Sequence, residues 1–559
     1  VHTRLSIIDI DGGHQPIRNA AGQLSLIANG EVYNYTELTD EFVTAGCRFE
    51  SRSDSETILH AYAIHGDDFA RHLHGMFAFA LLDSGRDRLI IGRDRLGIKP
   101  LFYAQTPDRF VFASELKALL PLLPFQPEIN PRALVEYLQN QFNTGGETIF
   151  EGVRRVPPGT WLRIDSDLNI ESHRYWSALD VTPRDTVPEE AETEFEALFD
   201  RVMTEHMRSD VPFGLFLSGG LDSGVLLAKL REHSKAPLKT YSVGFAGPGL
   251  DDELEQARWI AGQFGVEHIP LVLSGDEIFG HLVHTVWAAD DLMRDYASLA
   301  TSLLAQRAAQ DLKVVFSGEG GDEAFGGYRR YRQSPERRLK ALIRPGSGGF
   351  RTRGHWRGLR SRRVFGRRLR PLLPLARQPF VDAWGETPQA WSGLQRAQYT
   401  DLVTALPDNL LVKADRMLMS FGLEGRVPFV DHRIVEFGLS LPDGMKVSGR
   451  TGKAFLKRWA ERRIPHDYLY RPKRGFHVPV GHWLHGDLLT RLGEKLPANR
   501  AVRDWFDPTG VRRLVAEQQK SGNAGRELWS ILQFAVWHRL FIEGSADRPS
   551  VHEDLLDWI

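Results

Sequence analysis

Cysteine, long apolar runs and net charge are scarce in this sequence. Its 559 residues include one cysteine, Cys47, which excludes a disulfide framework and a zinc site built from several cysteines. No apolar stretch approaches the roughly 20 residues that span a bilayer, so we expect no membrane partner. The formal net charge of -2 excludes a chain-wide electrostatic attraction to nucleic acid. We therefore expect no nucleic-acid partner. These features fit a cytoplasmic protein.

The length and the first residues indicate several domains and an unusual start. A chain of 559 residues exceeds what one hydrophobic core supports, so two or more domains are expected. There is no initiator methionine and no signal peptide, and residues 1–4 lead directly into a strand-like stretch at 5–9. We therefore expect an N-terminally truncated chain.

Residues 1–180 are expected to form a β-rich domain, followed by a second domain at 181–559. Alternating segments separated by turn residues predict strands in the first domain at 25–28, 77–82, 88–92 and 109–113, with a helix at 55–65. A polar linker at 180–188 contains two prolines and marks the boundary. An acidic helix then begins the second domain, with Phe195, Phe199 and Val202 on its apolar stripe.

The second domain alternates strands and helices before it becomes largely helical. Apolar runs at 213–217, 240–245, 268–273 and 313–316 predict strands, and helices are expected between them at 252–264 and 298–310. This alternation is typical of a parallel sheet whose ligands lie beyond the carboxyl ends of its strands.

The most informative segment directly follows the first of these strands. Ser218-Gly-Gly-Leu-Asp-Ser-Gly224 combines a glycine-permitted turn with the start of a helix, which aims backbone N–H groups at one point and suits a polyphosphate. Asp222 is placed to hold Mg²⁺ against the same phosphates. The segment is not a Walker A loop, since it lacks the G-x-x-x-x-G-K pattern. An ordinary Ser/Gly-rich turn is the alternative. The pattern resembles the SGGxDS loop of ATP pyrophosphatases.

A companion loop follows the strand at 313–316. Ser317-Gly-Glu-Gly-Gly-Asp-Glu323 gathers three carboxylates, which repel one another unless a cation lies among them. We expect Asp322 and Asp222 to hold one Mg²⁺ ion together. Glu319 is then left to face the acyl substrate, the molecule that would react with the nucleotide. A flexible acidic surface loop is the alternative.

Neither loop contains a lysine, so positive charge for a phosphate-releasing reaction must come from elsewhere. Lys413 and Lys473 lie in ordered-looking contexts, at 410–417 and 471–476. A lysine in a water-poor site stabilises negative charge that develops on a phosphate. For each lysine, a surface salt bridge is the alternative.

Taken together, these residues resemble glutamine-hydrolysing asparagine synthetases over nearly the whole chain. The first domain is similar to class II glutamine amidotransferases, which implies an N-terminal-nucleophile αββα sandwich. The second is similar to a parallel-sheet adenine-nucleotide α-hydrolase-like (PP-loop ATPase) domain with helical additions. The motifs that carry the resemblance, besides the two loops, are 4–9, 29–34, 53–56, 75–80, 92–100, 113–117, 423–431 and 471–476.

In the first domain the resemblance implies a glutamine site. Arg4 would bind the α-carboxylate of glutamine. Asn29 and the N–H of Gly30 would form the oxyanion hole, and Glu31 and Asp54 would hold the α-ammonium group. Considered one at a time, these residues also have ordinary structural explanations. Asn29 and Gly30 could form a turn, and Asp54 could cap a helix.

The sequence departs from this family at its first residue. Members begin with a cysteine whose thiol attacks glutamine, whereas this chain begins with Val1. Cys47 lies inside the chain, so its amine is tied up in a peptide bond. We therefore expect no glutaminase nucleophile in this chain, an inactive glutaminase, and an incomplete sandwich with an exposed sheet edge. An upstream Met-Cys start would supply the missing nucleophile and complete the sandwich.

In the second domain the resemblance implies ATP-dependent conversion of aspartate to asparagine, with Mg²⁺ as cofactor. An acyl-adenylate forms with release of pyrophosphate, and ammonia then displaces AMP. The nitrogen comes from glutamine through an internal tunnel in the intact protein, or from ammonia in this chain. Glu319, Lys413 and Lys473 would be catalytic. ATP would contact Leu217, Ser218, Gly219, Gly220, Leu221, Asp222, Ser223, Val243 and Gly318.

The sequence is also compatible with other functions. Leu292 stands where many relatives carry proline near the acceptor pocket, which leaves a pathway-specific amidotransferase or a β-lactam-forming ligase as alternatives. A catalytically silent protein could instead bind RNA through 329–377, where Glu336 is the only acidic residue. We favour a solvated helical insertion for that basic stretch. A homodimer is also left open.

Overall fold

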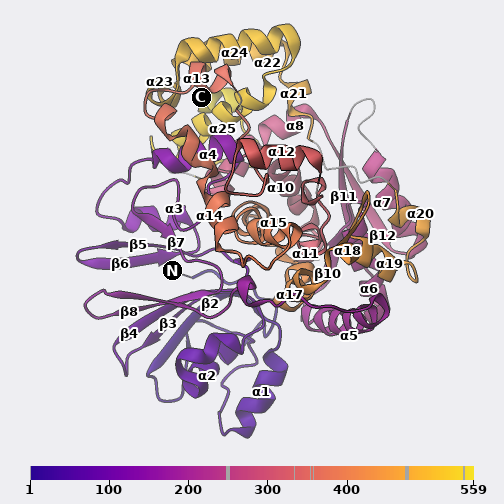
Figure 1. The fold of residues 1–559 in the computed structure, drawn as a ribbon. Coiled ribbons are helices and arrows are strands. Elements are labelled where there is room, and N and C mark those ends of the chain that lie inside the picture. The colour runs from indigo at the N-terminus through magenta and orange to yellow at the C-terminus, as the bar shows by residue number, and fades with distance from the viewer. Residues whose placement is uncertain are drawn as a thin grey trace.

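The computed structural model describes residues 2–246, 252–332, 334–352, 354–356, 358–471, 478–544 and 548–559. Its first third consists mainly of antiparallel sheets with helices α1 and α2 beside them (Figure 1). The rest combines a parallel sheet with many helices, and the last helices gather at the opposite end of the molecule from α1 and α2 (Figure 1). The chain is therefore a two-domain α/β protein.

Two sheets pack face to face in the first domain. The cluster between them joins Ala80 and Ile91 of the larger sheet to Leu101 and the partly buried Phe110 from the smaller sheet's side. The larger sheet has the order β1 (Ile17–Arg18), β2 (Leu24–Val32), β3 (Gly75–Asp83), β4 (Arg88–Arg93), β8 (Thr160–Asp165) and β9 (Ile170–Arg174). The smaller has the order β6 (Arg109–Ala113), β5 (Phe102–Thr106) and β7 (Val153–Arg155).

Helices cover the other face of the larger sheet. Phe42 of α1 (Tyr35–Thr44) and Ile58 of α2 (Glu56–His65) share one buried cluster with Leu26 of β2. The outer edge of β2 is covered partly by a side chain rather than a strand. The amide of Gln15 donates to the carbonyl of Ala28 at 3.0 Å and accepts from its N–H at 2.7 Å, as a neighbouring strand would.

The expectation of strand-like structure at 5–9 is wrong. This segment is a loop in which the guanidinium group of Arg4 donates to the backbone carbonyls of Ile8 and Asp9, at 2.5 and 3.0 Å. The N–H of Asp9 donates to the carboxylate of Asp210 at 2.9 Å. The apolar residues at 5–9 turn toward the second domain and pack against Val314, which explains why they do not pair within a sheet.

A five-stranded parallel sheet forms the centre of the second domain. The four predicted strands are present. A fifth strand, β14, was not predicted, because the C-terminal part of this domain was expected to be largely helical. A small hairpin of β15 (Val447–Ser448) and β16 (Thr451–Gly452) was missed in the same way. The sheet order is β12 (Glu267–Leu273), β11 (Lys239–Phe245), β10 (Phe213–Phe216), β13 (Val314–Phe316) and β14 (Glu424–Arg426).

The helices of the second domain pack around this sheet and form a cap at the C-terminal end. Those nearest the sheet are α5 (Pro188–His206), α6 (Leu221–His233), α7 (Asp252–Gln263), α9 (Leu282–Ala289), α10 (Ala297–Ala308), α11 (Gly321–Phe325), α16 (Val412–Met419), α17 (His432–Ser440) and α19 (Ala454–Ala460). Others are α8 (Gly275–Gly280), α12 (Pro335–Ile343), α13 (Leu359–Val364), α14 (Gln378–Glu386), α15 (Gly393–Leu402), α18 (Asp443–Lys446), α20 (His466–Leu469), α21 (Val480–Trp483), α22 (Gly486–Lys495), α23 (Arg500–Trp505), α24 (Pro508–Ser521) and α25 (Gly525–Phe541).

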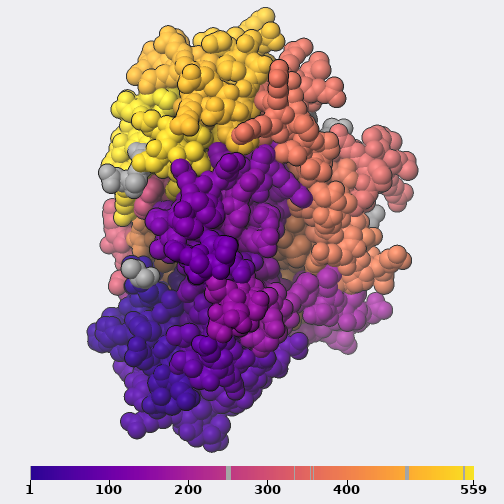
Figure 2. All heavy atoms as spheres, turned by 90° about the vertical axis from the view of Figure 1, so that its left-hand side faces the viewer, coloured from indigo at the N-terminus to yellow at the C-terminus, as the bar shows by residue number. Residues whose placement is uncertain are grey.

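The two domains share a continuous core. One buried cluster joins Leu134 and Tyr137 of α4 (Pro131–Asn140) to Trp529 and Trp537 of α25. The hydroxyl of Tyr137 also donates to the carbonyl of Ser530 at 2.9 Å. In the space-filling view the purple first third lies directly against the yellow C-terminal helices and the orange segment (Figure 2). Among the described residues, no helix combines the length and apolar composition needed to cross a bilayer.

The basic stretch 329–377 makes many contacts inside the protein. Arg330 and Arg351 both pair with the buried carboxylate of Asp401, at 2.8 and 2.6 Å. Trp356, the aromatic residue closely flanked by basic residues, is 4% exposed and packs on Phe365. A buried indole is not available to stack on a nucleobase, so these contacts favour the interpretation of this stretch as a helical insertion.

Candidate functional site

The two glycine-rich loops leave neighbouring parallel strands at the same edge of the sheet. β10 leads into 217–220 and β13 leads into 317–320, and the two strands pair directly. The chain moves outward in one direction from β10 to β11 and β12, and in the other from β13 to β14. Such a reversal of strand order opens a crevice beyond the carboxyl ends of the strands, where ligands bind in open α/β sheets.

The first loop is held in shape by its own hydroxyl groups. Gly219 has a φ of +71°, a left-handed conformation that glycine adopts without a steric penalty. The backbone N–H of Ser218 donates to the hydroxyl of Ser223 at 3.2 Å, and that hydroxyl donates to the carbonyl of Gly220. Tyr468 donates to the same carbonyl at 3.0 Å. α6 starts immediately afterwards at Leu221, so its N-terminal N–H groups face the crevice.

The second loop touches the first directly. A Cβ atom added to Gly318 would lie 2.9 Å from the Cβ of Asp222, and one added to Gly321 would lie 2.5 Å from its carboxylate. Any larger residue at either position would push the loops apart. Gly320 has a φ of +89°, which again favours glycine. These glycines therefore permit the close approach of the two loops.

Lys453 lies between the two predicted metal ligands. Its ammonium nitrogen is 2.5 Å from a carboxylate oxygen of Asp222 and 2.8 Å from one of Asp322. Burial alone would lower the pKa of Lys453, but the two carboxylates raise it above its ordinary value. The residue also has a left-handed φ of +53°, which is uncommon for lysine. Both carboxylates thus face one cation position.

This arrangement fits Mg²⁺ chemistry. Two carboxylates converge on one point beside a helix N-terminus that can take phosphate, and oxygen ligands are those that Mg²⁺ prefers. A Cβ atom on Gly327 would lie 1.8 Å from a carboxylate oxygen of Asp322, so glycine there leaves room for this carboxylate. The Lys453 ammonium group shows that the position accommodates a cation.

Sequence reasoning missed Lys453. It follows the two-residue strand β16, more than 200 residues from Asp222, and its only local signal is the short Thr-Gly-Lys sequence at 451–453. That sequence indicates a tight turn and gives no indication of a charge partner.

Glu319 and Lys413 meet inside the same crevice. The ammonium nitrogen of Lys413 lies 3.7 Å from the carboxylate of Glu319 and 3.5 Å from that of Asp295. Burial would lower the pKa of Lys413, but these two carboxylates raise it, so the side chain carries its positive charge at neutral pH. Lys413 is 6% exposed, which argues against the surface salt bridge considered above.

A single cavity of about 1080 Å³ connects these groups. Tyr468, Lys453 and Lys457 contribute to its wall. The predicted residues that line it are Leu217, Ser218, Gly219, Gly220, Leu221, Asp222, Ser223, Val243, Gly318, Glu319, Asp322 and Lys413. Lys473 lies outside the described residues.

In the first domain, Glu31 and Asp54 lie close to each other at the end of β2. The carboxylate of Asp54 accepts the backbone N–H of Val32 at 2.7 Å, and burial raises its pKa to about 6. Burial raises the pKa of Glu31 well above its ordinary range, and the carboxylate of Asp54 adds to the effect. Glu31 also lies 3.3 Å from the guanidinium group of Arg426 in β14, which links this position to the second domain.

The other predicted glutamine contacts have structural partners of their own. Arg4 donates to the backbone of its own loop, as described above. Asn29 and Gly30 lie within β2, and a Cβ atom on Gly30 would come 2.0 Å from the carbonyl oxygen of Met76 on the paired strand. Cys47 follows α1 and is half-buried, and burial raises the pKa of its thiol.

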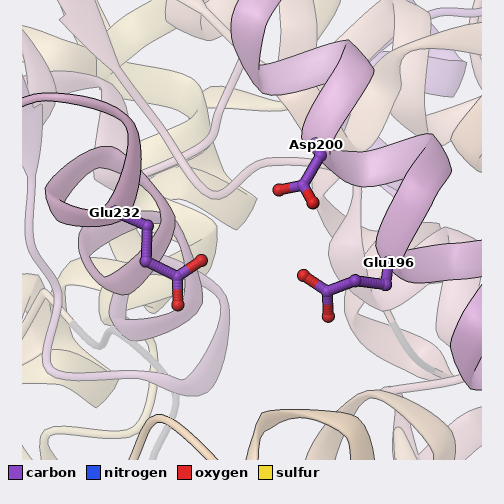
Figure 3. Close-up of side chains that lie close together, drawn as sticks. All are labelled: Glu196, Asp200 and Glu232. Carbon is purple, nitrogen blue, oxygen red and sulfur yellow. The ribbon is translucent and has the colours of Figure 1, made fainter.

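Three carboxylates elsewhere face a common point. Glu196 and Asp200 extend from α5 and Glu232 from α6 (Figure 3). The ammonium group of Lys229 occupies that point, at 2.9, 2.5 and 2.7 Å from the three carboxylates, and Arg463 contacts two of them. The cluster is therefore a salt-bridge network that joins two helices.

Comparison with known proteins gives consistent matches along the chain. The family model described as asparagine synthase matches residues 194–539, and the glutamine amidotransferase domain model matches 1–176. A Mycobacterium tuberculosis protein is 35% identical, over 98% of this chain and 90% of its own length. Glutamine-hydrolysing asparagine synthetase 1 of Bacillus subtilis is 33% identical, over 97% and 89%. Asparagine synthetase B of Escherichia coli is 28% identical, over 86% and 75%.

Proposed function

The chain belongs to the glutamine-hydrolysing asparagine synthetase family of ATP-dependent carbon–nitrogen ligases, and we propose that it converts aspartate to asparagine through an acyl-adenylate. The observation that carries this proposal is the convergence of the two loops on one cavity. Asp222 and Asp322 face a common cation position there, and Glu319 and Lys413 lie in the same cavity.

We assign the first loop and the N-terminus of α6 to the phosphates of ATP. Backbone N–H groups at a helix N-terminus bind anions without a lysine in the loop. Bound Mg²⁺, held by Asp222 and Asp322, would neutralise phosphate charge. Val243 and Gly318 would lie near the adenosine, since both line the same cavity.

The buried pair of Lys413 and Glu319 is suited to the acyl chemistry. The carboxylate oxygen of aspartate attacks the α-phosphorus, and the bond to the β-phosphate oxygen breaks to release pyrophosphate. A fixed ammonium group at Lys413 stabilises the charge that builds up during this step. Ammonia then attacks the acyl carbon, and Glu319 can accept the proton that nitrogen loses as AMP departs. Lys473 is proposed as a second cation for the same step.

We further propose that the first domain is an N-terminal-nucleophile sandwich and the second a PP-loop ATPase fold, divided near residue 180. The two packed sheets with helices outside support the first assignment, and the parallel sheet with its switch-point loop supports the second. Glu31 and Asp54 would hold the ammonium group of glutamine in the first domain. Arg4, Asn29 and Gly30 would contact its remaining groups.

Isotope transfer tests the proposed reaction. Aspartate labelled with ¹⁸O in its side-chain carboxylate is incubated with ATP, Mg²⁺ and ammonium, which makes the assay independent of glutamine hydrolysis. An acyl-adenylate leaves one labelled oxygen on AMP. Label in inorganic phosphate together with ADP would contradict the mechanism, and ATP turnover with another acid but not aspartate would contradict the acceptor. Asp222→Asn is the matched inactive variant.

A further inference from the structure

A second cavity, of about 590 Å³, lies where the two domains meet. Its size is typical of small-molecule sites. The strands and loops of the first domain form one wall, and α14, α15 and the π-helix Leu406–Leu411 contribute the other. It shares no lining residue with the nucleotide cavity or with the proposed glutamine contacts, among the residues that the structure describes.

Arginine residues give one wall of this cavity its character. Arg93 is 1% exposed, and its guanidinium group donates to the carbonyls of Lys99 and Gly97 at 2.7 and 2.8 Å. Arg95 also bonds to backbone carbonyls, and its Nε–H, although buried, has no hydrogen-bond partner among the described residues. Arg174 donates to a serine hydroxyl. These three guanidinium groups are thus bonded to neutral oxygens rather than to carboxylates in the described part of the chain.

The carboxylates of the cavity are already engaged. Asp408 accepts the hydroxyl of Thr144 at 2.6 Å, and Glu386 accepts that of Tyr399 at 2.8 Å. Burial raises the pKa of Glu136 to about 7, so this group is partly neutral at physiological pH. The guanidinium groups of Arg93, Arg95 and Arg174 therefore keep neutral oxygens as their hydrogen-bond partners in the described part of the chain, and the buried Nε–H of Arg95 remains to be satisfied.

The cavity is mechanically connected to the nucleotide site. Asp408 lies in the π-helix that continues directly into α16, which carries Lys413. The backbone that Arg93 holds belongs to Lys99, whose ammonium group pairs with Asp415 on α16 at 2.8 Å. A ligand that moved either contact would shift the helix on which the proposed catalytic lysine lies.

We propose that this interdomain cavity binds a small anion with a carboxylate or phosphate group, and that its occupancy alters the rate of the synthetase reaction. Arginine recognises both groups through charge-assisted hydrogen bonds. The binding claim stands independently of the reaction, whereas the effect on rate rests on the proposed function.

Calorimetric titration tests binding. The whole chain is first saturated with a non-hydrolysable ATP analogue and Mg²⁺, and inorganic phosphate or succinate is then added. One site per chain is expected. Arg174→Gln or Arg132→Gln should weaken it about tenfold, because both arginines line the cavity and each change removes a charged donor. Arg109→Gln is the matched control, since Arg109 is exposed and neither it nor its partner Asp108 lines the cavity. Binding of phosphate alone or succinate alone identifies the preferred anion.

Three results would overturn the site: no heat with either probe, affinities unchanged in both cavity variants, or equal weakening in Arg109→Gln. Its effect on the reaction is read as ammonium-dependent AMP formation with and without the probe that binds. If the bound anion changes the rate in the wild type but not in Arg174→Gln, the proposed effect of occupancy on the reaction is supported. If the rate is unchanged when the cavity is fully occupied, that effect is rejected, but the binding site still stands. Failure of AMP formation in all samples would instead reject the proposed function.

Discussion

Replacing Lys453 by methionine separates the two carboxylates from the cation that holds them together. In the wild type, the buried ammonium group lies 2.5 Å from Asp222 and 2.8 Å from Asp322. Methionine keeps the apolar stem but leaves two negative groups facing each other. Two unit charges about 5 Å apart repel by about 3 kcal/mol at an effective dielectric constant of about 20.

The expected loss of stability is smaller than for a fully buried pair. Removing one partner of a buried ion pair costs about 3–5 kcal/mol, but the side chains of Asp222 and Asp322 remain 19% and 16% exposed. We therefore expect the free energy of unfolding to fall by about 2–3 kcal/mol. Mg²⁺ with an ATP analogue should recover part of this loss, because a ligand that binds only the folded state stabilises it.

Urea unfolding monitored by tryptophan fluorescence measures the change, with and without Mg²⁺ and the analogue. Lys446→Met is the matched control, since Lys446 is also fully buried but bonds to a backbone carbonyl, at 3.2 Å. The control should show no loss of stability near neutral pH. Equal stability of Lys453→Met and the wild type, or a loss that Mg²⁺ and the analogue do not reduce, would show that Lys453 does not hold the two carboxylates at a cation position.

Three further predictions follow from buried charges. Lys413→Met should slow aspartate-dependent AMP formation about 10²–10³-fold in steady-state kinetics. Titration with ATP should show little change in affinity. A loss of ATP affinity as large as the loss of rate would contradict a role of Lys413 in the chemical step. Arg426→Met should cost about 3 kcal/mol in urea unfolding, because Glu31 and Glu424 lose their shared cation; wild-type stability would contradict this. Burial lowers the pKa of the Lys446 ammonium group to about 7 in the folded protein, whereas its value in the unfolded chain is about 10.4. Between these two pH values the unfolded chain binds more protons than the folded protein. The free energy of unfolding of the wild type should therefore rise with pH across this range. Lys446→Met should flatten that slope by about 1.4 kcal/mol per pH unit, and an unchanged slope would contradict the assignment.

Local patterns in the sequence were enough to predict the parallel strands and the loops that follow them. The apolar run before Ser218 and the glycines after it act over a few residues, and the sheet brings β10 and β13 together because both are buried parallel strands. The three-residue strand β14 was missed because so short an element has no detectable period and lies among helices.

Contacts between distant segments could not be predicted in the same way. Lys453 reaches Asp222 only after the chain has folded, and Arg426 meets Glu31 across the domain boundary. No spacing rule connects such partners in one sequence. The assignment of Arg4 to a ligand likewise rested on resemblance, and the loop contacts of its guanidinium group became visible only in the structure.

Anomalous X-ray scattering from Mn²⁺ in crystals grown with a non-hydrolysable ATP analogue tests most directly whether the two loops form one nucleotide site. We expect an anomalous peak bonded to carboxylate oxygens of both Asp222 and Asp322 and to phosphate oxygens of the analogue, with the Lys453 ammonium group displaced from between the carboxylates. A metal bonded to only one of these carboxylates, or phosphates bound away from residues 218–223, would contradict it.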